Sequence, residues 1–125
     1  MILLAYYAAL ATSDIRLKKN ISNTEVDNAL DIINKIELHS FDWKEDSRHQ
    51  KIGFIADELE ELDDNLSHGG GETEEGGLNT KMVDSFYLQG YEVKAIQELS
   101  LENKQLREIV SQLKDEIAEI KKALK

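Results

Sequence analysis

The sequence predicts an α+β fold, in which a small body of helices and a β-hairpin precedes a long C-terminal helix that forms a parallel coiled coil. Two observations support this prediction. Between positions 24 and 62 the apolar residues first follow the spacing of a helix, then alternate with polar residues as in a strand, and then follow helical spacing again. From Ser85 to Lys125 only Gly90 interrupts a helix-forming run, and apolar residues recur there every seven positions. We therefore divide the chain into residues 1–12, 13–84 and 85–125.

Composition limits the functional classes. The chain has 125 residues, enough for one small domain but not for two substantial cores. It contains no cysteine, so a disulfide frame and a thiolate metal site are excluded, and we expect no metal or other cofactor. A formal charge of −10 repels phosphate backbones, which disfavours nucleic-acid binding.

Residues 1–12 are apolar and uncharged, with Tyr6 and Tyr7 adjacent. The run is shorter than the roughly twenty residues that cross a bilayer, so we expect no membrane partner. A signal peptide is the alternative, but no basic region precedes the apolar run. We expect an extended tail that packs on a neighbour.

Residues 13–23 are polar and predict a loop with at most one short strand. Thr24 then offers an N-cap for a first helix that ends near Ile36. Within that helix the apolar side chains share one face, because they follow the spacing i, i+3, i+4 and i+7. They are Val26, Ala29, Leu30 and Ile33.

Period-two alternation from Leu38 to Trp43 predicts a strand, and a polar turn at 44–48 leads to a second strand that ends at Phe54. The two strands form a hairpin in which Gly53 permits a bulge or close approach. We expect Trp43 and Phe54 to pack in the core.

Residues 55–62 predict a short acidic helix. The segment from Asp57 to Glu75 contains nine acidic residues and no Lys or Arg, with glycines at 69–71 and 76–77. It lacks the Lys-Ser/Thr of a phosphate-binding loop and the ligand spacing of an EF-hand. We expect a mobile, solvated projection.

The final helix begins at an N-cap provided by Asp84 or Ser85. Two interleaved series of residues, each with a period of seven, give about four heptads. The a series is Ile96, Asn103, Val110, Ile117 and Leu124, and the d series is Leu99, Leu106, Leu113 and Ile120.

Charges beside the heptads favour a parallel coil. Glu102 and Glu116 at g positions match Arg107 and Lys121 at the e positions five residues on. The oligomer number stays open at this point. β-Branched a residues and Asn103 favour a dimer, whereas Ile109 widens the apolar face toward three or more strands.

The boundary between the apolar residues 1–12 and the polar body falls at a stretch that holds a serine hydroxyl, an acid and three cations. The stretch Ser13-Asp14-x-Arg16-x-Lys18-x-x-Ile21 resembles the opening motif of the intramolecular chaperone auto-processing domains, the S74 peptidase family. These domains end the precursors of phage tail spikes, tail fibres and neck appendages. Three later stretches match in the same order, namely 29–36, 52–58 and 95–99.

The resemblance implies that Ser13 is a nucleophile and Lys18 its base, with Lys19 as the competing candidate. A serine hydroxyl must lose its proton to attack a carbonyl, and a lysine can accept it if burial lowers the lysine pKa. Asp14 then flanks the scissile bond, and Arg16 stabilises an oxyanion or pairs with Asp14. We place the cleavage between Ser13 and Asp14, with the Thr12–Ser13 bond as the alternative.

The same resemblance implies a homotrimer whose partner is the upstream parent chain, of which residues 1–12 are a remnant. It implies action in the host cytoplasm during virion assembly, and absence from the mature virion after single-turnover self-cleavage. The alternative is a trimerisation and capping module without catalysis. We expect no general protease activity in trans, because His39, His49 and His68 show no triad context.

Overall fold

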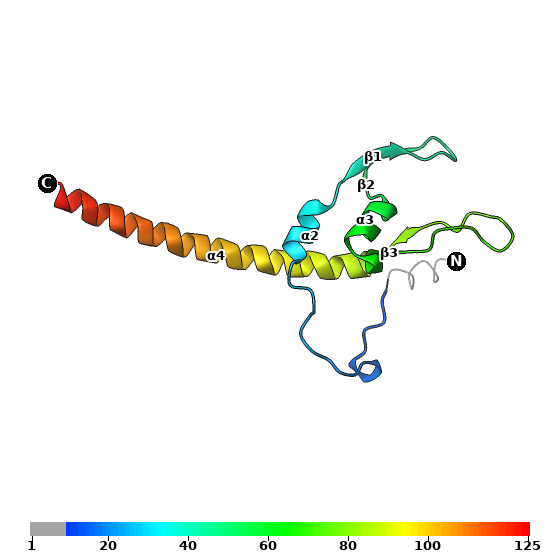
Figure 1. The fold of residues 1–125 in the computed structure, drawn as a ribbon, viewed down its shortest axis with the longest axis horizontal. Coiled ribbons are helices and arrows are strands. Elements are labelled where there is room, and N and C mark those ends of the chain that lie inside the picture. Colours follow the sequence, from blue (N-terminus) through cyan, green and yellow to red (C-terminus); the bar gives the residue numbers. More distant parts are fainter. Residues whose placement is uncertain (1–9) are drawn as a thin grey trace.

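A computed structural model describes residues 10–125 of the protein, so most of the predicted tail 1–12 lies outside the described residues. The described chain has a small body lying on one end of a long helix, which projects far beyond it (Figure 1). The elements are η1 (Ile15–Leu17), α2 (Ala29–Lys35), β1 (His39–Asp42), β2 (His49–Gly53), α3 (Ala56–Leu62), η2 (Asp64–Leu66), β3 (Ser67–His68), β4 (Met82–Val83) and α4 (Ser85–Ala123). These α and β elements confirm the predicted α+β class.

α4 begins where the sequence predicts. The side chain of Asp84 accepts a hydrogen bond from the backbone N–H of Tyr87, which caps the first turn. The helix has 39 residues, and at about 1.5 Å per residue it forms a rod roughly 60 Å long. Only the part of α4 nearest its N-terminus packs on the body, as Figure 1 shows.

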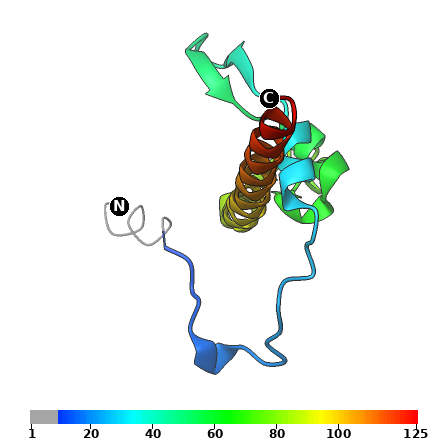
Figure 2. The same ribbon diagram turned by 90° about the vertical axis from the view of Figure 1, so that its left-hand side faces the viewer.

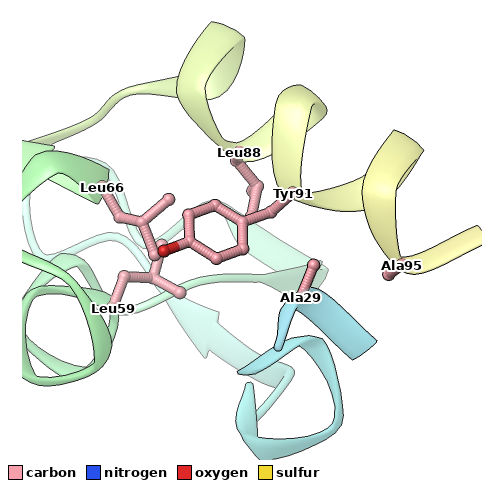
Figure 3. Close-up of a cluster of buried hydrophobic side chains, with 6 residues drawn as sticks. All are labelled: Ala29, Leu59, Leu66, Leu88, Tyr91 and Ala95. Carbon is pink, nitrogen blue, oxygen red and sulfur yellow. The ribbon is translucent and has the colours of Figure 1, made fainter. Parts of the chain in front are cut away.

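The core lies between α2, α3, η2 and the first turns of α4 (Figure 3). Its members are small or aliphatic residues arranged around one tyrosine ring. They are Ala29, Leu59, Leu66, Leu88, Tyr91 and Ala95. Because three of the six come from α4, the long helix forms part of the body as well as the predicted coil.

The first helix starts later than predicted. Thr24 does not cap α2; its Oγ1 accepts a hydrogen bond from the N–H of Val26 in a local turn. α2 begins at Ala29, and its N-cap residue Asn28 makes no side-chain capping hydrogen bond. The capping group comes instead from Glu98 in α4, whose carboxylate accepts from the first N–H groups of α2.

The predicted hairpin is confirmed. β1 and β2 pair antiparallel, with Phe41 opposite Gln50 and a bulge between His39 and Phe41. A Cβ on Gly53 would lie 2.9 Å from the Phe41 ring, so this close approach requires glycine.

The prediction that Trp43 and Phe54 pack in the core is wrong. They are 43% and 38% exposed. β1 and β2 form a two-stranded sheet, and in Figure 1 no further layer from residues 10–125 covers this hairpin. Alternation identified the faces of the strand, but it carries no information on whether a second layer exists.

The acidic, glycine-rich segment is exposed, as expected, but it is a paired ribbon and not an irregular loop. β3 pairs antiparallel with β4, and a further bridge joins Glu72 to Leu78. Gly69 has a φ of +91°, and a Cβ there would lie 2.5 Å from the carbonyl oxygen of Thr80. Glycine is therefore needed where the ribbon leaves the body.

Candidate functional site

Ser13 and Lys18 are brought together by the turn η1. The backbone N–H of Leu17 donates to the carbonyl of Asp14, and that of Lys18 donates to the carbonyl of Ile15. This tight turn folds the chain back, so that Lys18 Nζ donates a hydrogen bond of 2.7 Å to Ser13 Oγ. The two side chains that the motif singles out are therefore in direct contact, at the distance that nucleophile–base pairs show.

Asp14 and Arg16 hold the turn from its other side. Asp14 Oδ1 accepts from the backbone N–H of Arg16 at 2.9 Å, which makes Asp14 the N-cap of η1. The Arg16 guanidinium donates two hydrogen bonds to the same carboxylate, from Nε to Oδ1 at 3.1 Å and from Nη2 to Oδ2 at 2.7 Å. The side-chain hydrogen bond from Arg16 lowers the pKa of Asp14 below its usual value. Of the two roles considered for Arg16, this chain displays the pairing with Asp14.

The segment that carries these residues stands away from the body. In both Figure 1 and Figure 2, the blue segment that includes η1 lies apart from α4 and from the body. Its apolar side chains Ile15, Leu17 and Ile21 are 71%, 75% and 65% exposed. Ser13 and Lys18 are exposed as well. Water therefore surrounds the Ser13–Lys18 pair in the single chain.

The predicted coiled-coil residues form an apolar stripe along α4 that the single chain leaves open. All nine a and d residues are exposed, including Asn103. Leu124 follows the last helical residue Ala123 and serves as the C-cap. Burying one large aliphatic side chain contributes about 1.5–3 kcal/mol. Burial of this stripe in an assembly would therefore add substantial stabilisation to the chain.

An ion-pair network at the base of the ribbon was not predicted. Lys81 Nζ lies 3.0 Å from Glu60 Oε2 and also contacts Asp57. Glu60 in turn accepts from the buried hydroxyl of Ser67 at 2.9 Å. Hydrogen bonds from Lys81 lower the pKa values of Asp57 and Glu60. One sequence signal was available, since Lys81 is the first Lys or Arg after Lys51, across 29 residues rich in acids.

Tyr91 and Asp63 form a second unpredicted contact. Tyr91 Oη donates to Asp63 Oδ2 at 2.6 Å. Burial and this hydrogen bond raise the pKa of Tyr91 to about 12. Burial alone would raise the pKa of Asp63, but hydrogen bonds from Tyr91 and Asn65 outweigh it and hold that pKa below its usual value.

Each histidine contacts a carboxylate that sequence reasoning did not identify. His39 lies 2.7 Å from Glu58, His49 lies 2.7 Å from Asp42, and His68 lies 2.8 Å from Asp84. Glu37, His39 and Glu58 offer ligand atoms within 4.8 Å of one another, a set that could hold a metal ion. The direct His39–Glu58 hydrogen bond already satisfies two of these three groups.

Comparison with known families places the Ser13–Lys18 turn in a known domain. Residues 13–68 match the family model Peptidase_S74, described as chaperone of endosialidase. Residues 13–68 are therefore similar to the chaperone-of-endosialidase family. The match begins at Ser13 and takes in the motifs at 13–21, 29–36 and 52–58, whereas 95–99 and the heptads lie beyond it. Among curated proteins, no match to the chain was found.

No helix among the described residues is long and apolar enough to cross a membrane.

The segment that matches the chaperone-of-endosialidase model comprises η1, α2, the β1–β2 hairpin, α3, η2 and β3. α4 follows this segment and contributes half of its buried core residues.

Proposed function

We propose that this chain is an intramolecular chaperone that assembles as a homotrimer, aligns an upstream phage fibre, spike or appendage chain, and is released by self-cleavage at Ser13. The observation that carries the proposal is the 2.7 Å hydrogen bond between Lys18 Nζ and Ser13 Oγ at the first residue of the matched family segment. Localisation to the host cytoplasm during virion assembly, and loss from the mature virion, belong to the same proposal.

The exposed a and d stripe supports the assembly step. A parallel three-stranded coil buries it and places three η1 turns at one end of the assembly. Assembly also draws the upstream chains into register, which is the chaperone activity in physical terms. Glu102–Arg107 and Glu116–Lys121 pairs across chains favour the parallel orientation.

Ser13 Oγ is the attacking atom in the proposed reaction. Lys18, once neutral, takes the hydroxyl proton as Oγ bonds to a carbonyl carbon. The peptide C–N bond then breaks, and the proton returns from Lys18 to the departing amine. Water hydrolyses the resulting ester, restoring the Ser13 hydroxyl and leaving a carboxylate on the upstream fragment.

Ring size distinguishes the two candidate bonds. Attack of Ser13 Oγ on the Thr12 carbonyl closes a five-membered ring, whereas attack on its own carbonyl closes a strained four-membered ring. Within one chain the chemistry therefore favours the Thr12–Ser13 bond over the Ser13–Asp14 bond placed first by the sequence motif. Cleavage at Ser13–Asp14 requires Ser13 Oγ of a neighbouring chain.

Neutral Lys18 requires removal of the surrounding water, because burial disfavours a charged amine. In the single chain Lys18 is exposed and donates to Ser13. The proposed reaction is therefore coupled to assembly, which covers the turn. The same exposure favours the second candidate, a trimerisation and capping module in which the pair stays solvated and the chain stays intact.

Intact-mass measurement on the chain, with identification of the new N-terminal residue, separates the two candidates. Wild-type protein is expected to lose its first twelve residues, whereas Ser13→Ala and Lys18→Ala stay whole. Lys19→Ala is the matched control and is expected to process normally. Cleavage that persists in Ser13→Ala would overturn the assignment, and a stable wild-type trimer that is never cut would support the non-catalytic module.

A further inference from the structure

The turn η1 lies between the two residues of the proposed reaction, with Ser13 just before its N-cap and Lys18 as its C-cap. We propose that Asp14 positions this pair, because its side-chain oxygen caps η1 and the capped turn keeps Lys18 Nζ at Ser13 Oγ. Arg16 in turn fixes the carboxylate of Asp14. This inference rests on the proposed function and deepens it, because it assigns a physical role to both supporting residues of the motif.

Asp14 is the residue on which the hydrogen bonds of η1 converge. Two of the N–H groups of this three-residue turn donate to it, that of Arg16 to Oδ1 at 2.9 Å and that of Leu17 to the backbone carbonyl at 3.0 Å. A short 3₁₀ turn has little stability of its own, since isolated helical segments shorter than about 12–15 residues are marginal in water. The segment also lies apart from the body (Figure 2). The turn therefore depends on local bonds, and Asp14 accepts two of them.

The geometry of η1 decides whether the two reacting side chains meet. An extended chain from residue 13 to residue 18 spans up to about 17 Å between Cα atoms, which is farther than a lysine side chain reaches. The folded turn instead brings Lys18 Nζ to 2.7 Å from Ser13 Oγ. Because a displacement of about 1 Å between reacting groups can lower a rate about 100-fold, unfolding of η1 is expected to slow the proposed reaction strongly.

The guanidinium of Arg16 is bound to the capping carboxylate. Nε donates to both carboxylate oxygens of Asp14 at 3.1 Å, and Nη2 donates to Oδ2 at 2.7 Å. This ion pair is exposed, so it contributes little to stability by itself. Its effect is geometric, because it orients the carboxylate whose Oδ1 caps the turn.

A second Asp-x-Arg sequence, in the hairpin turn, gives an internal comparison. Asp46 Oδ1 accepts from the backbone N–H of Arg48 at 3.0 Å, as Asp14 does within the motif. The Arg48 guanidinium, however, lies over the Trp43 ring, 5.4 Å from its centroid. The ion pair that fixes the Asp14 carboxylate is therefore not a consequence of the Asp-x-Arg spacing alone.

Processing rates measured by intact mass separate a capping role from an effect of charge. Asp14→Ala removes the acceptor and is expected to slow processing at least about tenfold. Asp14→Asn keeps a capping oxygen without the charge, and asparagine caps about as well as aspartate, so its rate should stay within about threefold of wild type. The matched control Asp46→Ala removes the same bond from the hairpin turn and should process normally. Wild-type processing in Asp14→Ala, or equal slowing in Asp14→Asn, would overturn the proposal.

A double-mutant cycle tests whether Arg16 acts through Asp14. Arg16→Gln is expected to slow processing less than Asp14→Ala does, because the capping oxygen remains. In the Asp14→Ala background the same substitution should have no further effect, since the carboxylate that Arg16 orients is gone. Additional slowing there would place the guanidinium at the reacting atoms and overturn the role assigned to it.

Nuclear magnetic resonance tests the turn without cleavage. In the full chain carrying Ser13→Ala, the scalar couplings between HN and Hα of residues 15–17 report the φ angles of η1. They should move toward the values of an irregular chain in Asp14→Ala and stay unchanged in Asp14→Asn. Unchanged couplings in Asp14→Ala would refute this inference alone. A wild-type chain that is never cut would refute the proposed function, and altered couplings in Asp14→Ala would still identify Asp14 as the residue that holds the turn.

Discussion

Glu98 in α4 caps the N-terminus of α2, accepting a hydrogen bond of 2.7 Å from the backbone N–H of Leu30. Its second oxygen accepts from the N–H of Ala29 at 3.2 Å. A carboxylate is favoured at this end of a helix, where N–H groups lack intrahelical partners. The contact spans 68 residues of sequence and fixes the body to the helix that carries the heptads.

Replacement of Glu98 by alanine is expected to lower the free energy of unfolding of the body by about 1–2 kcal/mol, the usual cost of losing a helix cap. Thermal unfolding followed by circular dichroism measures this change. Glu108→Ala, on the exposed side of the same helix, is the control and should leave the melting temperature nearly unchanged. Equal melting temperatures for the two variants would refute the capping role.

Tyr91→Phe removes the hydrogen bond to Asp63 while keeping the ring in the core. We expect a loss of about 1–3 kcal/mol in stability, because a partly buried carboxylate loses its donor. Denaturant unfolding measures it. Tyr87→Phe, whose tyrosine is 40% exposed, is the matched control.

The raised pKa of Tyr91, about 12, also predicts alkaline sensitivity. The folded state retains this proton more strongly than the unfolded chain does, whose tyrosine titrates near 10. The stabilisation is therefore complete below about pH 10 and is lost as the pH rises toward 12. Tyr91→Phe should lack this step, and a variant with the wild-type alkaline transition would contradict the assignment.

The ion pairs of Lys81 with Asp57 and Glu60 predict how the stability of the body changes in acid. The pKa values of Asp57 and Glu60 are depressed by Lys81 below 3.8 and 4.5 respectively. Their contribution to stability is present above these values and is lost as the pH falls through the lower folded-state values. Melting temperatures measured across this range should fall less steeply for Lys81→Met than for wild type. Lys44→Met, at an exposed turn, should keep the wild-type slope.

Elements with a local signal were predictable from the sequence. The long C-terminal helix, the hairpin with its bulge near Gly53, and the Asp84 cap depend on residues within a few positions of one another, whereas the coil that the heptads predict stays a prediction. The contact of Lys18 with Ser13 agrees with the pairing that the family resemblance implies, but the turn η1 between them was not predicted.

Features that depend on distant residues were not predictable. The start of α2 is set by Glu98 and not by Thr24, and Tyr91 meets Asp63 across 28 residues. Exposure of Trp43 depends on the number of layers in the fold, which strand alternation does not report. The glycines that predicted a loose projection instead supply the positive φ angles of a paired ribbon.

The central claim is that coil assembly drives cleavage at Ser13. Leu106→Asp with Leu113→Asp places charges in the coil seam, yet neither residue belongs to the body core. This double variant should therefore stay monomeric with a folded body. Near-ultraviolet circular dichroism checks the body, and sedimentation checks the mass of the assembly.

Intact mass measured over time on wild type and on this double variant is the most direct test. The account predicts that wild-type chains lose their first twelve residues and expose Ser13 as the new N-terminus, while the monomeric variant stays whole. Cleavage of the monomeric variant at the wild-type rate would contradict it.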